Sequence, residues 1–126
     1  MKPLKFIKKL YLFSYFKEKV LPKLTDEVTD LELKEYVLPK LMNDTEIQKK
    51  YNSTPIDVKY FASILQKTLK DENKFYIFHV KLKNNSVVAV GASWFADGRE
   101  WFLRAYGLDC DGLWNDGNCF FSPETA

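Results

Sequence analysis

The dipeptide Asp97-Gly98 constrains the fold more than any other feature, because it lies between two runs of alternating residues. A two-residue type I′ turn needs a positive φ at both central positions, which Asp-Gly accepts at little steric cost. The turn predicts a β-hairpin in which Trp94 pairs with Trp101. The expected core face of this hairpin comprises Val88, Val90, Ala92, Trp94, Trp101, Leu103 and Ala105. The outer face comprises Ala89, Gly91, Ser93, Phe95, Glu100, Phe102, Arg104 and Tyr106.

The preceding run, 75–83, also alternates and is expected to form a third strand. Its turn at Asn84-Asn85 allows a two-residue or a three-residue loop, and a shift by one residue turns every side chain to the other face. We prefer the three-residue loop, because it places the apolar row on the core face: Tyr76, Phe78, Val80 and Leu82. Residues 119–121 supply a fourth strand after the loop 109–118.

Helical spacing dominates the first half of the chain. Apolar residues recur at intervals of three and four over 4–21, and a second, acidic helix is expected over 26–42. Pro22 should end the first helix, and Pro39 should end or kink the second, because proline lacks the N–H that a helix interior needs.

Two further helix starts follow. The stretch Asn43-Asp44-Thr45 is expected to cap a short helix over 46–51, and Thr54 followed by Pro55 predicts a longer helix that reaches about Lys70. Its apolar stripe is wide enough to pack on a sheet.

These patterns predict an α+β fold in a single domain, 1–126. Three or four helices in residues 1–72 would pack on a four-stranded antiparallel meander in residues 73–126. A chain of 126 residues is long enough to bury one core of ordinary size.

The formal net charge is only +2, but the charges occur in blocks. Residues 1–24 and 47–83 are basic, whereas residues 25–46 and 84–126 are acidic. Solvated faces of opposite sign that lie against each other explain this pattern most simply. A nucleic-acid surface is the alternative.

No run approaches the roughly 20 apolar residues of a membrane span, so none is expected. The apolar run near residue 10 is interrupted by Ser14 and Lys17, and no small-residue cleavage site follows it. These features favour a cytoplasmic protein.

Residues 45–70 resemble a helix-turn-helix, with Ile47, Tyr51 and Val58 at the positions of its buried frame. With the following hairpin as a wing, the stretch resembles a winged helix. This resemblance implies DNA binding as an alternative function. The chain departs from the pattern at Gln48, where a small residue should let the two helices touch.

The acidic loop 109–119 carries oxygen ligands and glycines at close spacing, as calcium loops do. It lacks the alternating ligands and the final glutamate of an EF-hand, and turn chemistry accounts for its Asp-Gly and Asn-Asp-Gly steps. We therefore predict no metal and no cofactor. Cys110 and Cys119 flank the loop and are expected to be free thiols with Cα atoms within about 7 Å.

The chain has one histidine and none of the common catalytic motifs, which argues against an enzyme. We predict instead a small non-enzymatic binding or regulatory domain. Its partner would be an unknown protein or a small ligand, and a homodimer is left open.

The candidate site lies on the outer face of the predicted sheet and comprises His79, Ser93, Phe102, Arg104 and Tyr106. Arg104 would supply a fork of donors for a carboxylate or phosphate, and Phe102 and Tyr106 would supply stacking surface. Two structural alternatives compete with this hypothesis. Either a helix covers this face, or Arg104 pairs with Glu100 on the same strand face.

Overall fold

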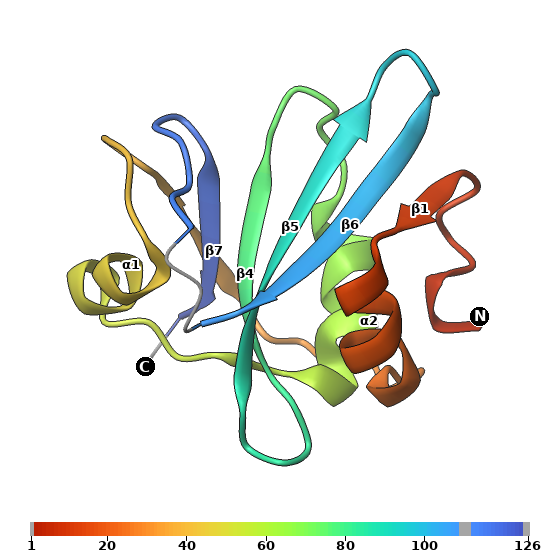
Figure 1. Ribbon diagram of the computed structural model, residues 1–126. Coiled ribbons are helices and arrows are strands. Elements are labelled where there is room, and N and C mark those ends of the chain that lie inside the picture. Colours follow the sequence, from red (N-terminus) through yellow and green to blue (C-terminus); the bar gives the residue numbers. More distant parts are fainter. Residues whose placement is uncertain (1, 109–111, 125–126) are drawn as a thin grey trace.

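A computed structural model describes residues 2–108 and 112–124. In these residues a mixed sheet of seven strands dominates the fold (Figure 1). The strands are β1 Leu10–Leu12, β2 Leu33–Val37, β3 Ile56–Asp57, β4 Tyr76–Lys81, β5 Val87–Phe95, β6 Glu100–Gly107 and β7 Cys119–Pro123. The helices are α1 Asp44–Tyr51 and α2 Val58–Thr68, with short π-helical or 3-10 turns at η1 Lys2–Leu4, η2 Phe16–Val20 and η3 Leu21–Lys23.

The strands are ordered β1-β6-β5-β4-β7-β2, and β3 pairs with β4 outside this path. The pairs β1–β6, β3–β4 and β4–β7 are parallel, and the other neighbours are antiparallel. The predicted α+β fold, with a helical part over 1–72 on a four-stranded antiparallel meander over 73–126, is therefore wrong. Strands from the first part of the chain form both edges of the sheet.

The helix expected over 4–21 is formed only in its last part: β1 replaces its middle, and residues 14–20 are helical, including the π-helical η2, before η3 follows. Leu12 is buried while its neighbour Tyr11 is 51% exposed, which is the two-residue period of a strand. β1 pairs with β6, Leu10 opposite Trp101. Pairing with the free edge of β6 gives the backbone groups of β1 hydrogen-bond partners and buries Leu12. This tertiary pairing overrides the helical spacing of the residues.

The helix expected over 26–42 is an extended segment followed by β2. Threonine residues hold the extended part against α2: Thr25 Oγ1 donates to the Lys59 carbonyl at 2.7 Å, and the Thr29 N–H donates to Ser63 Oγ at 3.3 Å. β2 then pairs antiparallel with β7. This pairing satisfies the backbone hydrogen-bonding groups of residues 33–37 against a strand edge, and it overrides the helical spacing of the segment.

The cap expected over 43–45 is formed by Asn43, whose side chain accepts from the Glu46 N–H at 2.8 Å while the Glu46 side chain accepts from the Asn43 N–H. The helix α1 therefore begins at Asp44, two residues earlier than expected. The predicted start of α2 at Thr54 is wrong. Ile56 and Asp57 form β3 beside β4, and Asp57 caps the helix by accepting from the Lys59 N–H at 3.0 Å. Pairing with β4 thus delays the helix by three residues.

The two hairpins among β4, β5 and β6 have the predicted register. His79 lies opposite Ala89, and Trp94 lies opposite Trp101. The three-residue loop at 83–85 is confirmed, with Asn85 at a φ of 67°. The predicted type I′ turn at 97–98 is wrong, because Arg99 at a φ of 51° carries the left-handed conformation instead.

The predicted fourth strand exists as β7, but it does not continue the meander. It lies beside β4 in parallel, with Ile77 opposite Phe120, and its other edge is covered by β2. A parallel neighbour requires a crossover connection, so the chain leaves β6 and returns on the far side of β4. Alternation alone cannot reveal such a crossover.

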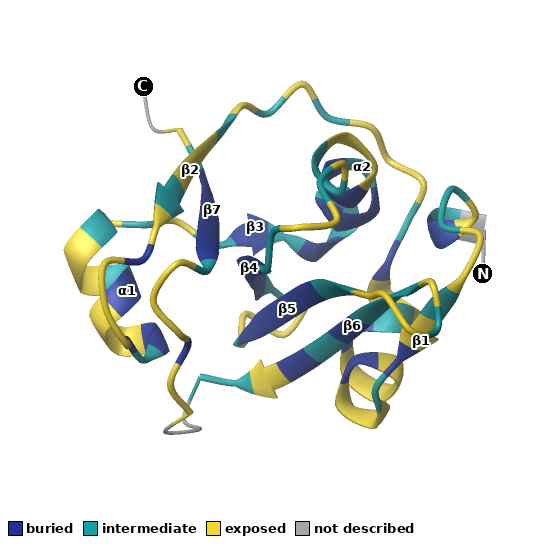
Figure 2. Ribbon diagram, turned by 90° about the horizontal axis from the view of Figure 1, so that it is seen from above, coloured by how far each residue is buried: buried dark blue, intermediate teal, exposed yellow. Residues whose placement is uncertain are grey.

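Side chains on the two faces of the sheet build two separate cores. The larger core lies on the inner face, where Phe61 and Leu65 of α2 pack on Phe78 and Val90. The smaller core lies on the outer face and joins Ile47 of α1 to the following residues: Leu38, Met42, Ile77, Ala89, Trp114 and Phe120. Figure 2 shows buried residues along β4 and β7, between these layers.

Trp114 closes the smaller core from the segment 112–118. Its backbone N–H donates to the Met42 carbonyl at 2.8 Å, and its indole packs directly over Gly91 of β5. A Cβ on Gly91 would lie 3.1 Å from Trp114 Cζ3 and 3.2 Å from Phe75 Cε1. Glycine at this position therefore lets two aromatic rings approach the sheet backbone.

We predict that Gly91→Ala lowers the free energy of unfolding by about 1–2 kcal/mol, because the buried Trp114 ring and the partly buried Phe75 ring must shift to admit the methyl group. Urea unfolding followed by tryptophan fluorescence measures the change. Gly112→Ala is the matched control, since a Cβ there meets nothing within 4 Å. Equal stability of the two variants would show that Trp114 does not seat tightly on β5.

Candidate functional site

The outer face of the sheet is divided into a covered half and an open half. α1 and Trp114 cover the part formed by β4, β7 and β2. No helix of the described residues contributes to a core over the part formed by β1, β6 and the adjacent end of β5. The candidate binding residues are exposed along the boundary between the covered half and the open half.

A buried carboxylate fixes this boundary. Asp44, the first residue of α1, is 4% exposed, and its Oδ1 accepts from Trp114 Nε1 at 2.8 Å. The same oxygen lies 2.8 Å from His79 Nε2 on β4. Two ring nitrogens from distant segments therefore share one oxygen atom, at the helix N-terminus where the helix dipole favours a carboxylate.

His79 belongs to this buried cluster and not to an exposed site. It is 2% exposed, and its Nδ1 has no hydrogen-bond partner among the described residues. The structure thus places the first of the predicted site residues behind α1 and Trp114. The predicted register placed His79 correctly on the outer face, opposite Ala89. The sequence did not reveal that the segment 112–118 covers this part of the face.

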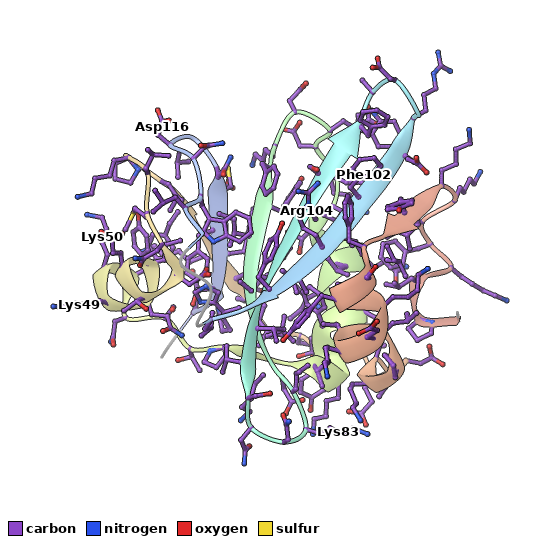
Figure 3. The ribbon with its side chains drawn as sticks, in the orientation of Figure 1. Lys49, Lys50, Lys83, Phe102, Arg104 and Asp116 are labelled. Atoms are coloured by element: carbon purple, nitrogen blue, oxygen red, sulfur yellow. The ribbon has the colours of Figure 1, made fainter. Side chains whose placement is uncertain are left out.

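The open half carries the remaining predicted residues. Ser93, Phe102, Arg104 and Tyr106 are all at least partly exposed and lie on the same face of β5 and β6. The side chains of Phe102 and Arg104 lie over these strands (Figure 3). The structure therefore brings together four of the five residues.

Four rings in mutual contact, which we call the aromatic patch, cover the open half: Tyr11, Phe13, Phe95 and Phe102. Phe95 and Phe102 stack with centroids 4.8 Å apart and an interplanar angle of 18°. The ring centroids of Tyr11 and Phe13 each lie 5.5 Å from the Phe102 centroid, on the side of β6 where β1 pairs. Because Tyr11 precedes Phe102 by 91 residues in the sequence, its presence here depends on the unexpected strand β1.

Arg104 joins the aromatic patch to a neighbouring cavity. Its guanidinium carbon lies 4.4 Å from the centroid of the Phe13 ring, a cation–π arrangement. Within the described residues Arg104 makes no ion pair, so the pairing with Glu100 that competed with the site hypothesis is not formed.

The cavity has a volume of about 380 Å³ and opens on the outer face beside Arg104. Among the residues that line it are Asp44, Phe75, Arg104, Tyr106, Trp114, Asn115 and Asn118. Of the predicted residues, only Arg104 and Tyr106 line this cavity. Ser93 and Phe102 lie on the same face beyond its rim.

The sequence signals for the other lining residues were weak. Asp44 was interpreted only as part of a helix cap, and Asn115 and Asn118 only as turn residues. The Asn118 side chain accepts from the Asn115 N–H at 3.0 Å, which is indeed turn chemistry. A lone histidine on a predicted outer face was the one available hint of a buried acid nearby.

The helix-turn-helix arrangement is not formed. α1 packs on the outer face and α2 on the inner face, with β3 between them. Lys49 and Lys50 project from α1, whereas Lys83 lies at the distant turn between β4 and β5 (Figure 3). These cations do not form one surface, and DNA binding has no support from this geometry.

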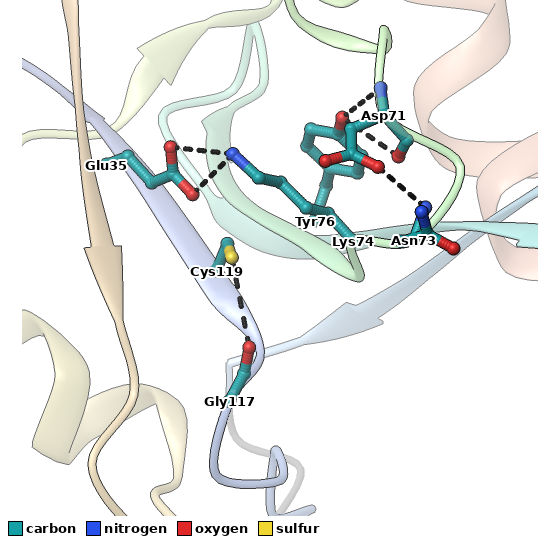
Figure 4. A network of polar contacts seen from close by, with 7 residues as sticks. All are labelled: Glu35, Asp71, Asn73, Lys74, Tyr76, Gly117 and Cys119. Atoms are coloured by element: carbon teal, nitrogen blue, oxygen red, sulfur yellow. Dashed lines mark hydrogen bonds and ion pairs between the residues drawn. The ribbon is translucent and has the colours of Figure 1, made fainter.

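The paired-cysteine prediction lies partly outside the described residues, because Cys110 is among 109–111. Cys119 is a buried free thiol whose Sγ lies 3.8 Å from the Gly117 carbonyl (Figure 4). Burial raises the pKa of Cys119 to about 11, and the nearby Glu35 carboxylate adds to this effect. Lys74 bonds to Glu35 at 2.8 Å and lowers the pKa of that carboxyl.

Within residues 2–108 and 112–124, no group of three or more His, Cys, Asp or Glu side chains is arranged to hold a metal. No helix of this part of the chain is long and apolar enough to cross a membrane. Comparisons with models of known families, with curated proteins and with solved structures gave no match.

We predict that Asp44→Ala lowers the free energy of unfolding by about 2–4 kcal/mol, because it leaves the buried Trp114 and His79 ring nitrogens without a partner. Asp44→Asn should cost less, since the amide oxygen still accepts. Urea unfolding measures stability, and the indole N–H resonance of Trp114 reports the lost hydrogen bond. Asp116→Ala, at an exposed loop position, is the control, and equal effects at both sites would contradict the shared-oxygen arrangement.

We predict that Cys119 is nearly inert in the folded protein. In a Cys110→Ser background it is the only thiol, and its raised pKa should slow alkylation by iodoacetamide at pH 8 by at least ~100-fold relative to the urea-unfolded chain. Alkylation rates followed by mass spectrometry test this. Comparable rates in the two states would show that the thiol is accessible.

The same pKa shift has a consequence for stability. A thiol whose pKa is higher in the folded state stabilises the fold fully below the unfolded pKa of about 8.5, and this contribution is lost as the pH rises towards 11. The free energy of unfolding should therefore fall less steeply over this range in Cys119→Ala. An unchanged slope would contradict the shift.

Proposed function

We propose that this chain is a small non-enzymatic binding domain that holds a small anionic ligand in the cavity on its outer sheet face. The observation that carries this proposal is the cavity itself, with Arg104 and the aromatic rings of Phe75, Tyr106 and Trp114 in its wall. Its volume of about 380 Å³ falls in the range of small-molecule sites, which combine apolar walls with a few polar groups.

The lining residues favour a ligand that joins a flat apolar body to a carboxylate or phosphate. Tyr106 and Trp114 stand nearly edge to face, with centroids 6.0 Å apart and an interplanar angle of 64°, and offer ring surface. The guanidinium of Arg104 supplies paired donors that match a carboxylate or phosphate. The side-chain amides of Asn115 and Asn118 add polar groups at the other side of the cavity.

The titratable groups of the cavity favour binding over catalysis. Asp44 Oδ1 already accepts from one ring nitrogen and lies beside a second, so this oxygen is not free to act as a base. His79 lies behind it, 2% exposed. Among the described lining residues, Arg104 and Tyr106 are the remaining ionisable groups, and neither is a ready proton acceptor near neutral pH.

We predict that benzoate and phenyl phosphate bind the cavity with roughly millimolar affinity, as expected for ligands of about ten heavy atoms. Titrations followed by NMR should shift the Trp114 indole N–H and the Arg104 Nε–H resonances. Arg104→Ala should weaken binding at least ~10-fold through loss of a charge-assisted hydrogen bond, and leave the Tm nearly unchanged.

Arg99→Gln is the matched control, because Arg99 is exposed at the hairpin turn and does not line the cavity. Benzyl alcohol, which keeps the ring but lacks the charge, should bind more weakly than benzoate. The proposal fails if neither anion shifts these resonances, if Arg99→Gln weakens binding as much as Arg104→Ala, or if Arg104→Ala unfolds the protein.

A further inference from the structure

Strand β6 presents a symmetric charge pattern on its outer face. Glu100, Phe102 and Arg104 occupy alternate positions, so the acid and the base flank the phenylalanine at equal distances along the strand. Their inward neighbours Trp101 and Leu103 pack on the inner core. The pattern acid–aromatic–base thus faces outward as a unit.

The two charged residues do not neutralise each other within the chain. They stand four residues apart, roughly 13 Å along an extended strand. Within the described residues neither forms an ion pair, and Arg104 stacks on Phe13 instead. Both charges are therefore available to an external partner.

The surroundings of this unit have the composition of a protein interface. In the aromatic patch, the side chain of Tyr11 is 51% exposed and that of Phe95 is 40% exposed. Both rings contact the partly buried ring of Phe102. Contiguous exposed rings next to an arginine are typical of interaction surfaces, whose strongest contributors are aromatic residues and arginine. The rings are joined to one another, so a partner would meet a single continuous surface.

We propose that the partner is a second copy of this chain, bound through the aromatic patch in an isologous dimer. In a two-fold interface each contact between two residues occurs twice, with the roles of the two chains exchanged. An axis through Phe102, with the two β6 strands antiparallel, places Glu100 opposite the partner's Arg104. The same operation places Arg104 opposite the partner's Glu100, so both charges are paired by one symmetry element.

The dimensions of packed sheets permit this arrangement. Two sheets that pack face to face lie about 10 Å apart, with their strands within about 30° of alignment. Glutamate and arginine side chains reach across half of such a gap from each side, while the phenylalanine rings fill its centre. The open half of the outer face is the part that α1 and Trp114 leave uncovered.

The proposed dimer does not depend on the ligand cavity, although the dimer contact and the ligand would both use Arg104. A guanidinium that pairs with a carboxylate of the second copy is not free for an anionic ligand, so the two uses exclude each other at one time. The Glu100→Arg variant keeps Arg104 and should be monomeric. Ligand titration of that variant therefore tests the cavity separately from the dimer.

Sedimentation equilibrium of the full chain tests the dimer. We expect a dimer at ~0.5 mM protein, a concentration at which a contact with a Kd of ~0.1 mM is mostly formed. Glu100→Arg and Arg104→Glu should each weaken association at least ~10-fold, because each places like charges opposite one another twice. Lys83→Glu, a charge reversal at the distant β4–β5 turn, should leave association unchanged (Figure 3).

Charge exchange makes the test specific. The double variant Glu100→Arg/Arg104→Glu should dimerise again, and an equimolar mixture of the two single variants should form a heterodimer. Circular dichroism and urea unfolding establish that each variant is folded. A monomeric wild-type chain at ~0.5 mM overturns the proposal, as do single variants that still dimerise or a mixture that does not associate.

Discussion

The carboxylate of Asp44 holds together three segments that are distant along the chain. One is the start of α1, the second is β4 through His79, and the third is the segment 112–118 through Trp114. Because these segments meet at one oxygen atom, the outer face of the sheet is sealed on one side and uncovered on the other. The cavity and the aromatic patch both lie on the uncovered side of this boundary.

A polar contact in this position has a different role from the apolar core beneath α2. The inner core includes Phe61, Phe78 and Val90, and burial of such side chains supplies most of the driving force for folding. The outer core is smaller and includes the rings of Trp114 and Phe120. There the shared oxygen fixes an orientation: it holds the indole of Trp114 over Gly91, and the indole forms one wall of the cavity.

The sequence predicted the parts of the fold that depend on near neighbours. The two hairpins have the expected register because alternation and turn residues act over a few positions, and Asn43 caps α1 as expected. The helices over 4–21 and 26–42 were wrong because their residues pair with strands more than 80 positions away. Helical spacing of leucines does not reveal an available strand edge.

The sequence predicted the candidate site about as far as it predicted the fold. Phe102, Arg104 and Tyr106 share a face because all three lie on one strand at a spacing of two. His79 shares that face too, yet it is covered, because its cover comes from a segment whose position no local pattern specifies. Phe13 could not be assigned to the site, since its place beside Arg104 follows from the parallel pairing of β1 with β6.

The origin of the two edge strands bears on how the chain emerges during synthesis. β1 and β2 both come from the first 37 residues, but their partners β6 and β7 come from the last 27. The early strands therefore leave the ribosome with exposed backbone groups and no partner, while the local β4–β5–β6 hairpins can form as soon as they appear. Until β7 arrives, the β4 border of this central ribbon lacks its parallel neighbour and is open to other chains.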